Sequence, residues 1–564
     1  MNQTVRYIIF IAVSLAIIQA WQAYEQKVNP RPLHPPGASS SVDAGGAPAA
    51  PAPEAAAAPQ PGSPPSAPPS VQPDETPGPL QTQDTELWTA EFSPRGGGLS
   101  SFILKGRKQQ ERARPGAERE GVNLVQARLG EALPLSTDLA LPGGFGLSST
   151  YQFVPGQGTN ELVFQRSRGS VTVTKRYSWN PSSYVLHLQI TVVGAPAGPL
   201  PVRTIYTAFE PPAAERHWWN LGPRPEIHQT ACLISGERSV ERRAFTDNKP
   251  EEELKGTPSF TGIDYKYFLA ALSPGKDPAT SSCAIGAPKE PWSAVGDQQA
   301  TLTRTLTATP GTPAITELEV YLGPKDSAAL AAADHDLAKS VDLGFFEIIA
   351  RWFIQPILRL FQKLVGNWGV SIILLTLLVK LMTLPLTHRQ MKSMEEGRRL
   401  APEVEKIKEK FAGDQQRIQV ETMKMYKEHN YQPLAGCVPM LIQLPVWYAL
   451  YQALSSSFEL YNEPFIHGWI NDLTAIDPYY ITPVLMTVTM ILTQLLTPQA
   501  AAPTPEMKYI TYAMPVFFGF FMLSLPSGLV LYIFTNNLLS IAQSLWFRRK
   551  FPQSRPPEPA TGAK

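Results

Sequence analysis

The chain has 564 residues and a formal net charge of +1. At roughly 150 residues per domain, this length predicts three or four structural units, and the near-zero charge gives no global field that would attract nucleic acid. The three cysteines are too few for a disulfide-rich scaffold, and no Cys/His cluster has the spacing of a zinc site, so no metal centre is expected.

Residues 1–24 are predicted to form a transmembrane anchor. The apolar run YIIFIAVSLAIIQAW follows Arg6, and bulky Trp21 and Tyr24 stand where the cleavage site of a signal peptide would need small residues. These two aromatic side chains suit the membrane–water interface instead. A cleaved signal peptide is the alternative. Residues 25–83 are rich in Pro and Ala and cannot bury a core, so they are expected to form a disordered tether.

Residues 84–340 have the pattern of an all-β domain. The segments SVTVTKRYSW and YVLHLQITVVG alternate polar and apolar residues and are joined by NPSS (180–183), which predicts a β-hairpin. GTPAITELEVYLGP predicts a further strand between two turns, and glycine-rich stretches such as Gly96-Gly97-Gly98 mark other turns. We therefore expect a β-sandwich over this range.

The chain becomes strongly apolar beyond residue 340. Residues 344–365 carry Arg351, Arg359 and Lys363 among bulky apolar side chains, so this segment is expected to lie along the membrane surface as an amphipathic helix. Together with the N-terminal anchor, the segments that follow predict a polytopic α-helical membrane protein with six spans, a five-helix core and a large all-β external domain. The five candidate spans after the surface helix are 368–387, 433–456, 481–497, 510–525 and 527–546.

The charges of the loops predict the orientation of these spans. Residues 388–432 and the tail 547–564 are rich in Lys and Arg, whereas the loop 457–480 has four acidic residues and neither Lys nor Arg. The positive-inside rule places both termini in the cytoplasm and the β domain outside. In a bacterium that side is the oxidising periplasm, where Cys232 and Cys283 could form a disulfide, although the sequence leaves this pairing open.

The basic segment 388–432 is expected to form a helical hairpin in the cytoplasm. APEVEKIKEKF and QQRIQVETMKMYKEH have helical spacing of apolar residues, and Ala412-Gly413-Asp414 separates them. This hairpin and the tail could form a docking surface for a partner, and an ordinary solvated helical loop is the alternative. The basic residues proposed for docking are Arg398, Arg399, Lys406 and Lys408 in the hairpin and Arg548, Arg549 and Lys550 in the tail.

A lysine interrupts the apolar segment ILLTLLVKLMTLP. Thr376, Lys380, Thr383 and Thr387 are spaced i, i+4, i+7 and i+11, so they share one face of a helix. A lone lysine could extend its ammonium to the membrane surface. The threonines on the same face indicate instead a polar surface that faces the protein interior or a water-filled cavity. A charge in that position costs about 2.5–3.5 kcal/mol on insertion scales, which favours a functional role.

Other predicted spans carry polar residues that could face the same cavity. Their structural alternative is ordinary hydrogen bonding between helices, and no acidic residue is embedded opposite Lys380, so an anionic visitor could supply the counter-charge. The candidates are Gln443 in the third span, Thr489 and Thr493 in the fourth, and Tyr532 and Asn536 in the sixth.

The sequence lacks the common catalytic and nucleotide-binding motifs. It contains no P-loop, no dinucleotide fingerprint, no HExxH and no nucleophile elbow, so neither a catalytic residue nor a cofactor is predicted. A Ser–Lys hydrolase dyad is disfavoured because Ser371 points away from the Lys380 face. We expect that the chain is not an enzyme. The remaining alternatives are a small-molecule secondary transporter and an assembly scaffold that translocates nothing.

Three stretches resemble the membrane core of the YidC family of bacterial membrane protein insertases. They are GCVPMLIQLPVWYALYQAL (436–454), WINDLTAIDPYYITPVLM (469–486) and LPSGLVLYIFTNNLLSIAQ (525–543). The order of anchor, large external domain, surface helix, basic hairpin and basic tail is similar to that of the Gram-negative members. In residues 84–335 the resemblance rests on position and on FSPRGGGL and GIDYKYFLAAL.

The resemblance implies an external domain of the β-supersandwich type and a five-helix core around a hydrophilic groove, closed to the outside and open to the cytoplasm and lipid. It implies that the protein moves nascent transmembrane segments from the cytoplasm into the bacterial inner membrane, alone or with the Sec translocon. The expected partners are nascent membrane protein clients, the ribosome, the Sec translocon and membrane lipids, with no sequence-specific nucleic acid.

The resemblance also assigns individual positions. Aligned through LLVKLMTLPLT, the groove cation of the family, usually arginine, falls on Lys380, which keeps the charge but lacks the bidentate fork. Thr376, Gln443 and Tyr532 match other groove or client-contact positions. Trp469 matches an aromatic residue near the external interface.

Overall fold

The structure is a computed structural model of the chain. It describes residues 78–106, 120–125, 132–141, 144–156, 158–209, 228–237, 239–244, 249–277, 279–288, 297–429, 431, 438–496 and 505–550. The predicted anchor, nearly all of the tether and the tail beyond residue 550 lie outside these residues, as does the side chain of Gln443.

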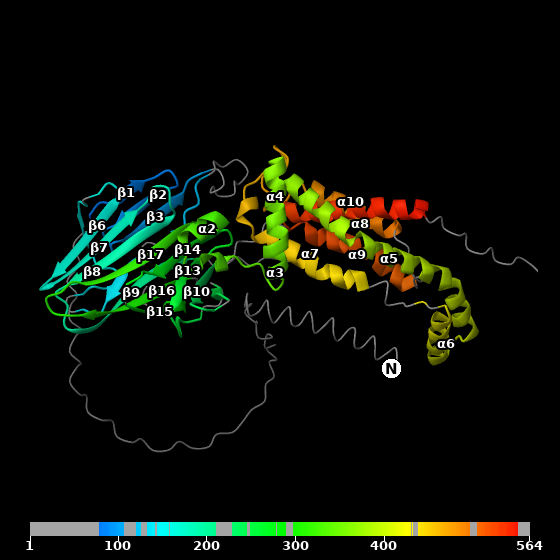
Figure 1. Ribbon diagram of the computed structural model, residues 1–564, viewed down its shortest axis with the longest axis horizontal. Coiled ribbons are helices and arrows are strands. Elements are labelled where there is room, and N and C mark those ends of the chain that lie inside the picture. The colour runs from blue at the N-terminus through cyan, green and yellow to red at the C-terminus, as the bar shows by residue number, and fades with distance from the viewer. Residues whose placement is uncertain are drawn as a thin grey trace, which may run out of the picture.

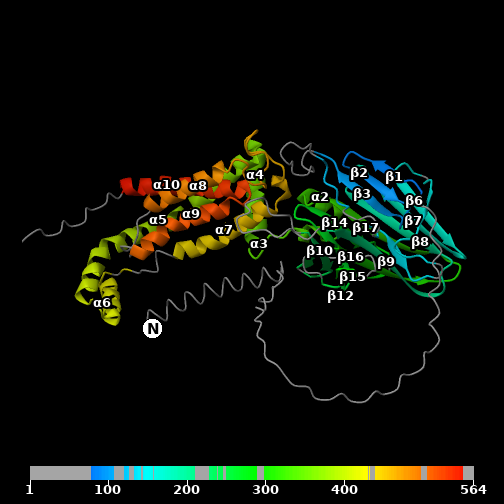
Figure 2. The ribbon, with the colours of Figure 1, turned by 180° about the vertical axis from the view of Figure 1, so that it is seen from behind.

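Three parts follow one another along the long axis of the molecule (Figure 1). The strands gather at one end, a bundle of long helices occupies the middle, and α6 lies at the opposite end. The same order is visible from behind (Figure 2). The short helix α4 crosses the bundle at the end that faces the strands, at a steep angle to α5, α8 and α10.

The β domain contains three sheets, and its strand pairs within the described residues are antiparallel. Their orders are β1-β2-β3, β11-β10-β13-β14-β17-β8-β7-β6-β5 and β12-β15-β16-β9-β4. The strands are β1 (Gln81–Asp84), β2 (Trp88–Ser93), β3 (Gly98–Leu104), β4 (Thr137–Leu139), β5 (Gln152–Val154), β6 (Glu161–Arg168), β7 (Val171–Trp179), β8 (Val185–Val193), β9 (Gly198–Phe209), β10 (Gln229–Ile234), β11 (Glu241–Ala244), β12 (Glu252–Leu254), β13 (Pro258–Asp264), β14 (Phe268–Pro274), β15 (Thr280–Gly286), β16 (Asp297–Ala308) and β17 (Ala314–Pro324).

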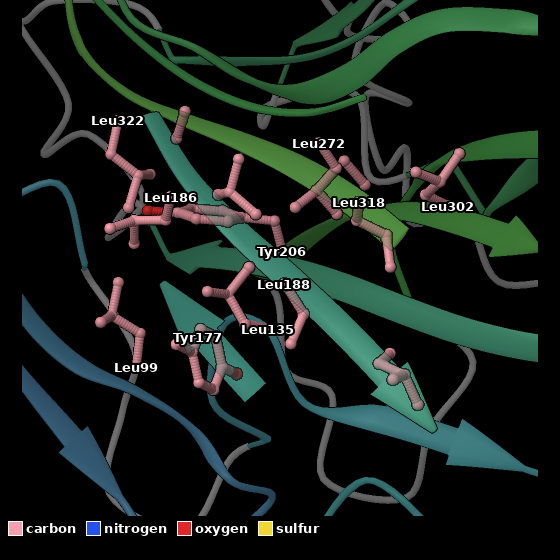
Figure 3. Close-up of a cluster of buried hydrophobic side chains, with 14 of the residues drawn as sticks. Leu99, Leu135, Tyr177, Leu186, Leu188, Tyr206, Leu272, Leu302, Leu318 and Leu322 are labelled. Atoms are coloured by element: carbon pink, nitrogen blue, oxygen red, sulfur yellow. The ribbon is translucent and has the colours of Figure 1, made fainter. Parts of the chain in front are cut away.

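The predicted hairpin is confirmed as β7 and β8, which pair from Thr172↔Val193 to Trp179↔Leu186. In both strands, buried residues largely alternate with more exposed ones, because successive side chains point to opposite faces of a sheet. The buried side chains belong to one apolar core that all three sheets share, and the rings of Tyr177 and Trp179 on β7 contact Phe92 of β2. Figure 3 shows Leu186 and Leu188 of β8 beside Tyr206 of β9 in this core.

A disulfide joins the two large sheets. It links Cys232 of β10 to Cys283 of β15, with a Cα–Cα distance of 6.7 Å. The pairing that the sequence left open is therefore made. It connects strands from two different sheets, a relationship that no local sequence pattern reveals.

A buried lysine holds the glycine-rich turn before β3. Lys175 lies on the core face of β7, and its Nζ donates hydrogen bonds to the carbonyl oxygens of Gly96 (2.9 Å) and Leu135 (2.6 Å). Tyr177 donates to the carbonyl of Gly97 at 2.6 Å. Gly96 and Gly97 have φ angles of +69° and +52°, which glycine adopts without strain. The GGG stretch is thus the place where β7 binds the start of β3.

The helical part begins after β17. It contains short 3-10 segments at Leu337–Ser340 and Phe458–Leu460 and a π-helical turn at Ala350–Ile354. The helices are α2 (Ser327–Ala333), α3 (Glu347–Ile349), α4 (Gln355–Val365), α5 (Trp368–Lys410), α6 (Gln415–Glu428), α7 (Val438–Ser456), α8 (Ile481–Leu496), α9 (Pro505–Met522) and α10 (Ser527–Lys550).

A two-residue connection turns the chain from the surface helix into the bundle. Gly366 ends α4 in the left-handed conformation with φ +71°. Asn367 then caps α5, because its side-chain oxygen accepts the amide hydrogen of Val370 at 3.0 Å. Gly366 and Asn367 thus form the turn between two helices that cross steeply.

Helix α5 runs through the boundary predicted at residue 387. It has 43 residues, or about 65 Å at 1.5 Å per residue. It therefore includes both the expected span 368–387 and the first helix of the expected hairpin. The charge pattern changes at residue 388, but the backbone hydrogen bonds continue, and Pro385 and Pro402 are accommodated inside the helix. Asp414 caps α6, so the predicted break at 412–414 forms the turn of the hairpin.

Within the described residues, two helices are both long enough and apolar enough to cross a membrane, Trp368–Lys410 and Ser527–Arg549. Shorter apolar helices lie at Ile481–Leu496 and Ala513–Met522. The count of six spans therefore stays a prediction.

The core of the β domain continues into the loop after α7. Phe458 and Tyr461 of this loop are buried in the same cluster as the β-sandwich core. Their rings contact Phe268 of β14, with centroids 5.7 and 5.5 Å away. Tyr267 donates a hydrogen bond to the carbonyl oxygen of Ser455, at the end of α7, at 3.1 Å. The β domain and the loop after α7 thus share one apolar cluster, and a hydrogen bond also joins the domain to the end of α7.

The buried lysine predicts a pH dependence of stability. Burial lowers the pKa of Lys175 to about 7, whereas an unfolded lysine titrates near 10.4. Between these values the unfolded chain holds more protons, so this residue makes stability rise with pH. The denaturant midpoint of the β-sheet signal should increase from pH 7 to pH 9, and Lys175→Met should flatten that increase. An equal increase in both proteins would contradict this assignment.

Candidate functional site

Lys380 is held between two long helices. Its Nζ, on α5, donates to the side-chain oxygens of Ser540 at 2.7 Å and of Asn536 at 3.4 Å, both on α10. Asn536 and Ser540 are four residues apart and so share one face of their helix. Both partners are neutral. Within the described part of the chain, the salt bridges of the bundle do not include Lys380.

The threonines near Lys380 bond mainly to their own helices. Thr376 is 1 % exposed and donates to the carbonyl of Ile372 at 2.6 Å. Thr383 donates to the carbonyl of Val379 at 2.9 Å. Such bonds to the preceding turn satisfy a hydroxyl donor without another helix and leave lone pairs on its oxygen. Thr376 is thus buried within the bundle, whereas Thr383 is partly exposed.

The threonines of α8 also donate to carbonyl oxygens of their own helix. Thr489 donates to the carbonyl of Met486 at 2.8 Å, and Thr493 donates to that of Thr489 at 2.8 Å. Thr493 also approaches the carbonyl of Asn537 on α10 at 3.5 Å. Of the predicted set, the structure brings Lys380 and Asn536 into direct contact and places Thr493 against α10.

Tyr532 lies deeper in the bundle than the lysine contact. It is 2 % exposed and belongs to the main apolar cluster of the helices, with Ile372 and Leu375 of α5 and Met486 of α8. It precedes Asn536 by one helical turn and so shares a face of α10 with that residue. Gln443 lies on α7, and nothing further is described of its side chain.

Trp469 belongs to the loop that joins α7 to α8. Its indole Nε1 donates to Oδ1 of Asp477 at 2.9 Å. Burial alone would raise the pKa of Asp477, but hydrogen bonds from Thr482, Trp469 and Tyr479 outweigh it and hold the pKa below its ordinary value. The expected interface aromatic residue is therefore also a hydrogen-bond donor to a buried carboxylate.

The basic residues proposed for docking are largely solvent-accessible. Arg398, Arg399, Lys406 and Lys408 are exposed on the part of α5 that extends toward α6. A small apolar contact holds the hairpin together, formed by Leu400, Met425 and Tyr431 with Val404, Ile407 and Tyr426. In the last helix, Arg549 is exposed and Arg548 donates to the carbonyl of Leu495 at 3.4 Å. The side chain of Lys550 lies outside the described residues.

Sequence reasoning missed two residues of this region. Ser540 could have been found, because it lies four residues after Asn536 on the predicted polar face of α10. Asp477 could have been found as an acidic residue shortly before the start of α8, a position that favours a cap. Its bond to Trp469 could not, since it depends on the fold of the loop.

Two family models match adjacent parts of the chain. One, described as the YidC periplasmic domain, matches residues 82–356, and the other, described as the 60Kd inner membrane protein, matches residues 360–554. These matches and the fold define an inner-membrane protein with a β-rich periplasmic domain and a helical core.

Curated relatives are similar over most of their length. A membrane protein insertase YidC from an Anaeromyxobacter species is 34 % identical over 508 residues, which cover 87 % of this chain and 88 % of the relative. Another from Geobacter sulfurreducens is 33 % identical over 480 residues, covering 83 % and 85 %. A solved active YidC insertase is 18 % identical, with a TM-score of 0.35, covering 82 % of this chain and 91 % of the other. The chain belongs to the YidC family of membrane protein insertases.

The contact between Lys380 and Ser540 predicts a measurable stability effect. Ser540→Ala removes an oxygen that accepts from a half-buried ammonium, and this should cost about 1 kcal/mol. Thermal unfolding of the helical signal in detergent is the measurement. Ser524→Ala is the matched control, because the hydroxyl of partly exposed Ser524 donates locally to the carbonyl of Phe521. Equal shifts in the two variants would contradict a role for Ser540 at Lys380.

Proposed function

We propose that the chain moves nascent transmembrane segments from the cytoplasm into the inner membrane through a hydrophilic groove, alone or with the Sec translocon. The observation that carries this proposal is the ammonium of Lys380, which lies between α5 and α10 and contacts neutral oxygens. An acidic group of a visiting chain could replace or join these oxygens. The residues proposed to line the groove are Thr376, Lys380, Thr383, Gln443, Thr489, Thr493, Tyr532 and Asn536.

The energetics of insertion support a groove without a nucleotide site. A client helix of about 20 apolar residues gains several tenths of a kcal/mol per residue on entering lipid, on the order of 5–10 kcal/mol in total. The obstacle is the polar flank of the client, whose groups have no hydrogen-bond partners in hydrocarbon. A polar groove that reaches partway across the membrane shortens this path. The membrane potential then favours outward movement of an acidic flank by about 2.3 kcal/mol per charge per 100 mV.

We propose a topology of six spans with both termini in the cytoplasm and the β domain in the periplasm. The loop charges support it, because the acidic loop 457–480 contacts the β domain while the basic hairpin lies at the other end of the bundle. Helices α5, α7, α8, α9 and α10 would be the five core spans, preceded by residues 1–24.

We propose that α3, the π-helical turn and α4 lie at the periplasmic membrane surface. This segment has two apolar faces. One contains Ala350, Ile354 and Leu358 and packs on the bundle. The other is exposed and includes Ile348, Trp352, Leu360 and Leu364, spaced at helical intervals. A helix that crosses the bundle at its outer end and exposes such a stripe suits the boundary between head groups and acyl chains.

Replacing the lysine tests the charge of the groove. Lys380→Ala should impair insertion of clients with acidic translocated flanks about tenfold, since the attraction for the flank is lost, whereas Lys380→Arg should retain activity because the positive charge remains. Reconstituted vesicles with a short client provide the measurement. Insertion by the alanine variant at the wild-type rate would contradict the electrostatic role. Client insertion without solute flux distinguishes an insertase from a transporter.

Charge reversal in the hairpin tests ribosome docking. Arg398→Glu together with Arg399→Glu should weaken co-sedimentation with ribosomes and reduce its salt dependence, because each lost phosphate contact lowers the salt slope by about one unit. The matched control is Lys255→Glu together with Lys276→Glu, which makes the same charge change at exposed positions of the β domain. Equal binding curves for both double variants would remove the hairpin from the docking surface.

A further inference from the structure

We propose that Asp477 and Gly369 are positioning residues that close the outer end of the helical core. Through the loop 457–480 they fix the outer ends of α5, α8 and α10 to one another. A client at Lys380 would then meet a closed end on the periplasmic side. This inference rests on the proposed function for the direction of the client's path, and it adds the residues that would make the closure.

The first attachment is to α8. Asp477 is 1 % exposed, and its Oδ2 accepts hydrogen bonds from the backbone nitrogen and the hydroxyl of Thr482, both at 2.7 Å. Its Oδ1 accepts from the indole of Trp469 at 2.9 Å and from the backbone nitrogen of Tyr479 at 3.0 Å. One buried carboxylate thus joins the start of α8 to two separate parts of the loop.

The second attachment is to α10. The backbone nitrogens of Ser527 and Gly528 donate to the carbonyls of Ala475 and Leu473, at 2.7 and 2.8 Å. These are two of the first amides of the helix, which have no partner within it. The hydroxyl of Ser527 donates to the carbonyl of Asp472 at 3.0 Å. The loop therefore supplies the acceptors for the first amides of α10.

The third attachment is to α5. Asn367, the cap of this helix, donates through its side-chain nitrogen to the carbonyl of Phe465 at 3.2 Å. The ring of Phe465 rests on Gly369 so closely that a Cβ at that position would lie 2.1 Å from a ring carbon. Glycine is therefore required for this contact. Ile470 and Leu473 of the same loop are buried in the apolar cluster of the helices.

Three helices thus begin on one folded loop. Lys380 lies 12 residues farther along α5 than Trp368, or about 18 Å away. The outer ends cannot separate without breaking the hydrogen bonds of Asp477 and moving Phe465 from Gly369. The contacts nearer the opposite end, from Lys380 to Asn536 and Ser540, involve exchangeable side-chain oxygens. The arrangement favours opening at the cytoplasmic side.

Cysteine labelling tests this closure without any client. The reporter is Thr376→Cys, one turn outward from Lys380, in a protein with Cys437→Ser; Cys232 and Cys283 are joined in a disulfide. A membrane-impermeant maleimide is added to the periplasmic side of spheroplasts. The otherwise unchanged chain should resist labelling, and Asp477→Ala should increase the labelling rate at least tenfold. Gly369→Val should have a similar effect because it displaces Phe465.

Two further variants separate closure from general destabilisation. His467→Ala changes an exposed residue of the same loop and should leave labelling unchanged. Asp477→Asn keeps one carbonyl oxygen for Trp469 and Tyr479 and should give an intermediate rate. If Asp477→Ala does not accumulate in the membrane, Trp469→Phe, which removes one of the four donors and keeps an aromatic ring, provides the decisive measurement.

The proposal is overturned if Asp477→Ala and Gly369→Val accumulate in the membrane and label no faster than the reporter alone. If they do not accumulate, it is overturned when Trp469→Phe labels no faster than the reporter alone. It is also overturned if His467→Ala labels as fast as they do. Labelling requires no client, so it can succeed while the Lys380 variants show wild-type insertion. That combination would support the closure and contradict the proposed role of the lysine.

Discussion

A charged ammonium between apolar helices must find oxygen partners within the protein, and this requirement ties α5 to α10. Water is absent from hydrocarbon, and a cation there is costly unless the protein or a cavity supplies polar atoms. Ser540 and Asn536 supply them for Lys380. The helix that carries these two residues also packs on α7 and α8. The lysine contact therefore joins α5 to a helix that two further members of the bundle also contact.

Buried charged groups of the β domain also find their hydrogen-bond partners within the protein. Lys175 is completely buried, yet its partners are backbone carbonyls of the turns that it holds. Asp264 is buried beside Arg242 and Lys325, and both cations also donate to the carbonyl of Ser340, at the start of the connection to the membrane. In these places, polar groups that would destabilise an apolar core when unpaired serve to join segments far apart in the sequence.

Local patterns predicted those features that depend on neighbours in the sequence. Alternation predicted the β7–β8 hairpin, the turn residues 412–414 predicted the break before α6, and helical spacing placed Lys380 and the threonines on one face. The pairing of Cys232 with Cys283 and the bond from Trp469 to Asp477 depend on how distant segments meet. The continuity of α5 was missed for another reason. A change in charge marks where a helix leaves the membrane, but it does not interrupt the hydrogen bonds of the backbone.

The shared core at Phe268, Phe458 and Tyr461 has a consequence for how this architecture can be divided. The two family models separate the chain between residues 356 and 360, but two of the side chains that complete the β-sandwich lie about a hundred residues beyond that boundary. Exchanging the periplasmic domain between relatives at this boundary would thus pair the domain of one protein with the loop of another, and the side chains at their contact would no longer fit. The domain and the loop after α7 therefore form one packing unit. We expect compensating substitutions to arise in pairs, one in the domain and one in the loop.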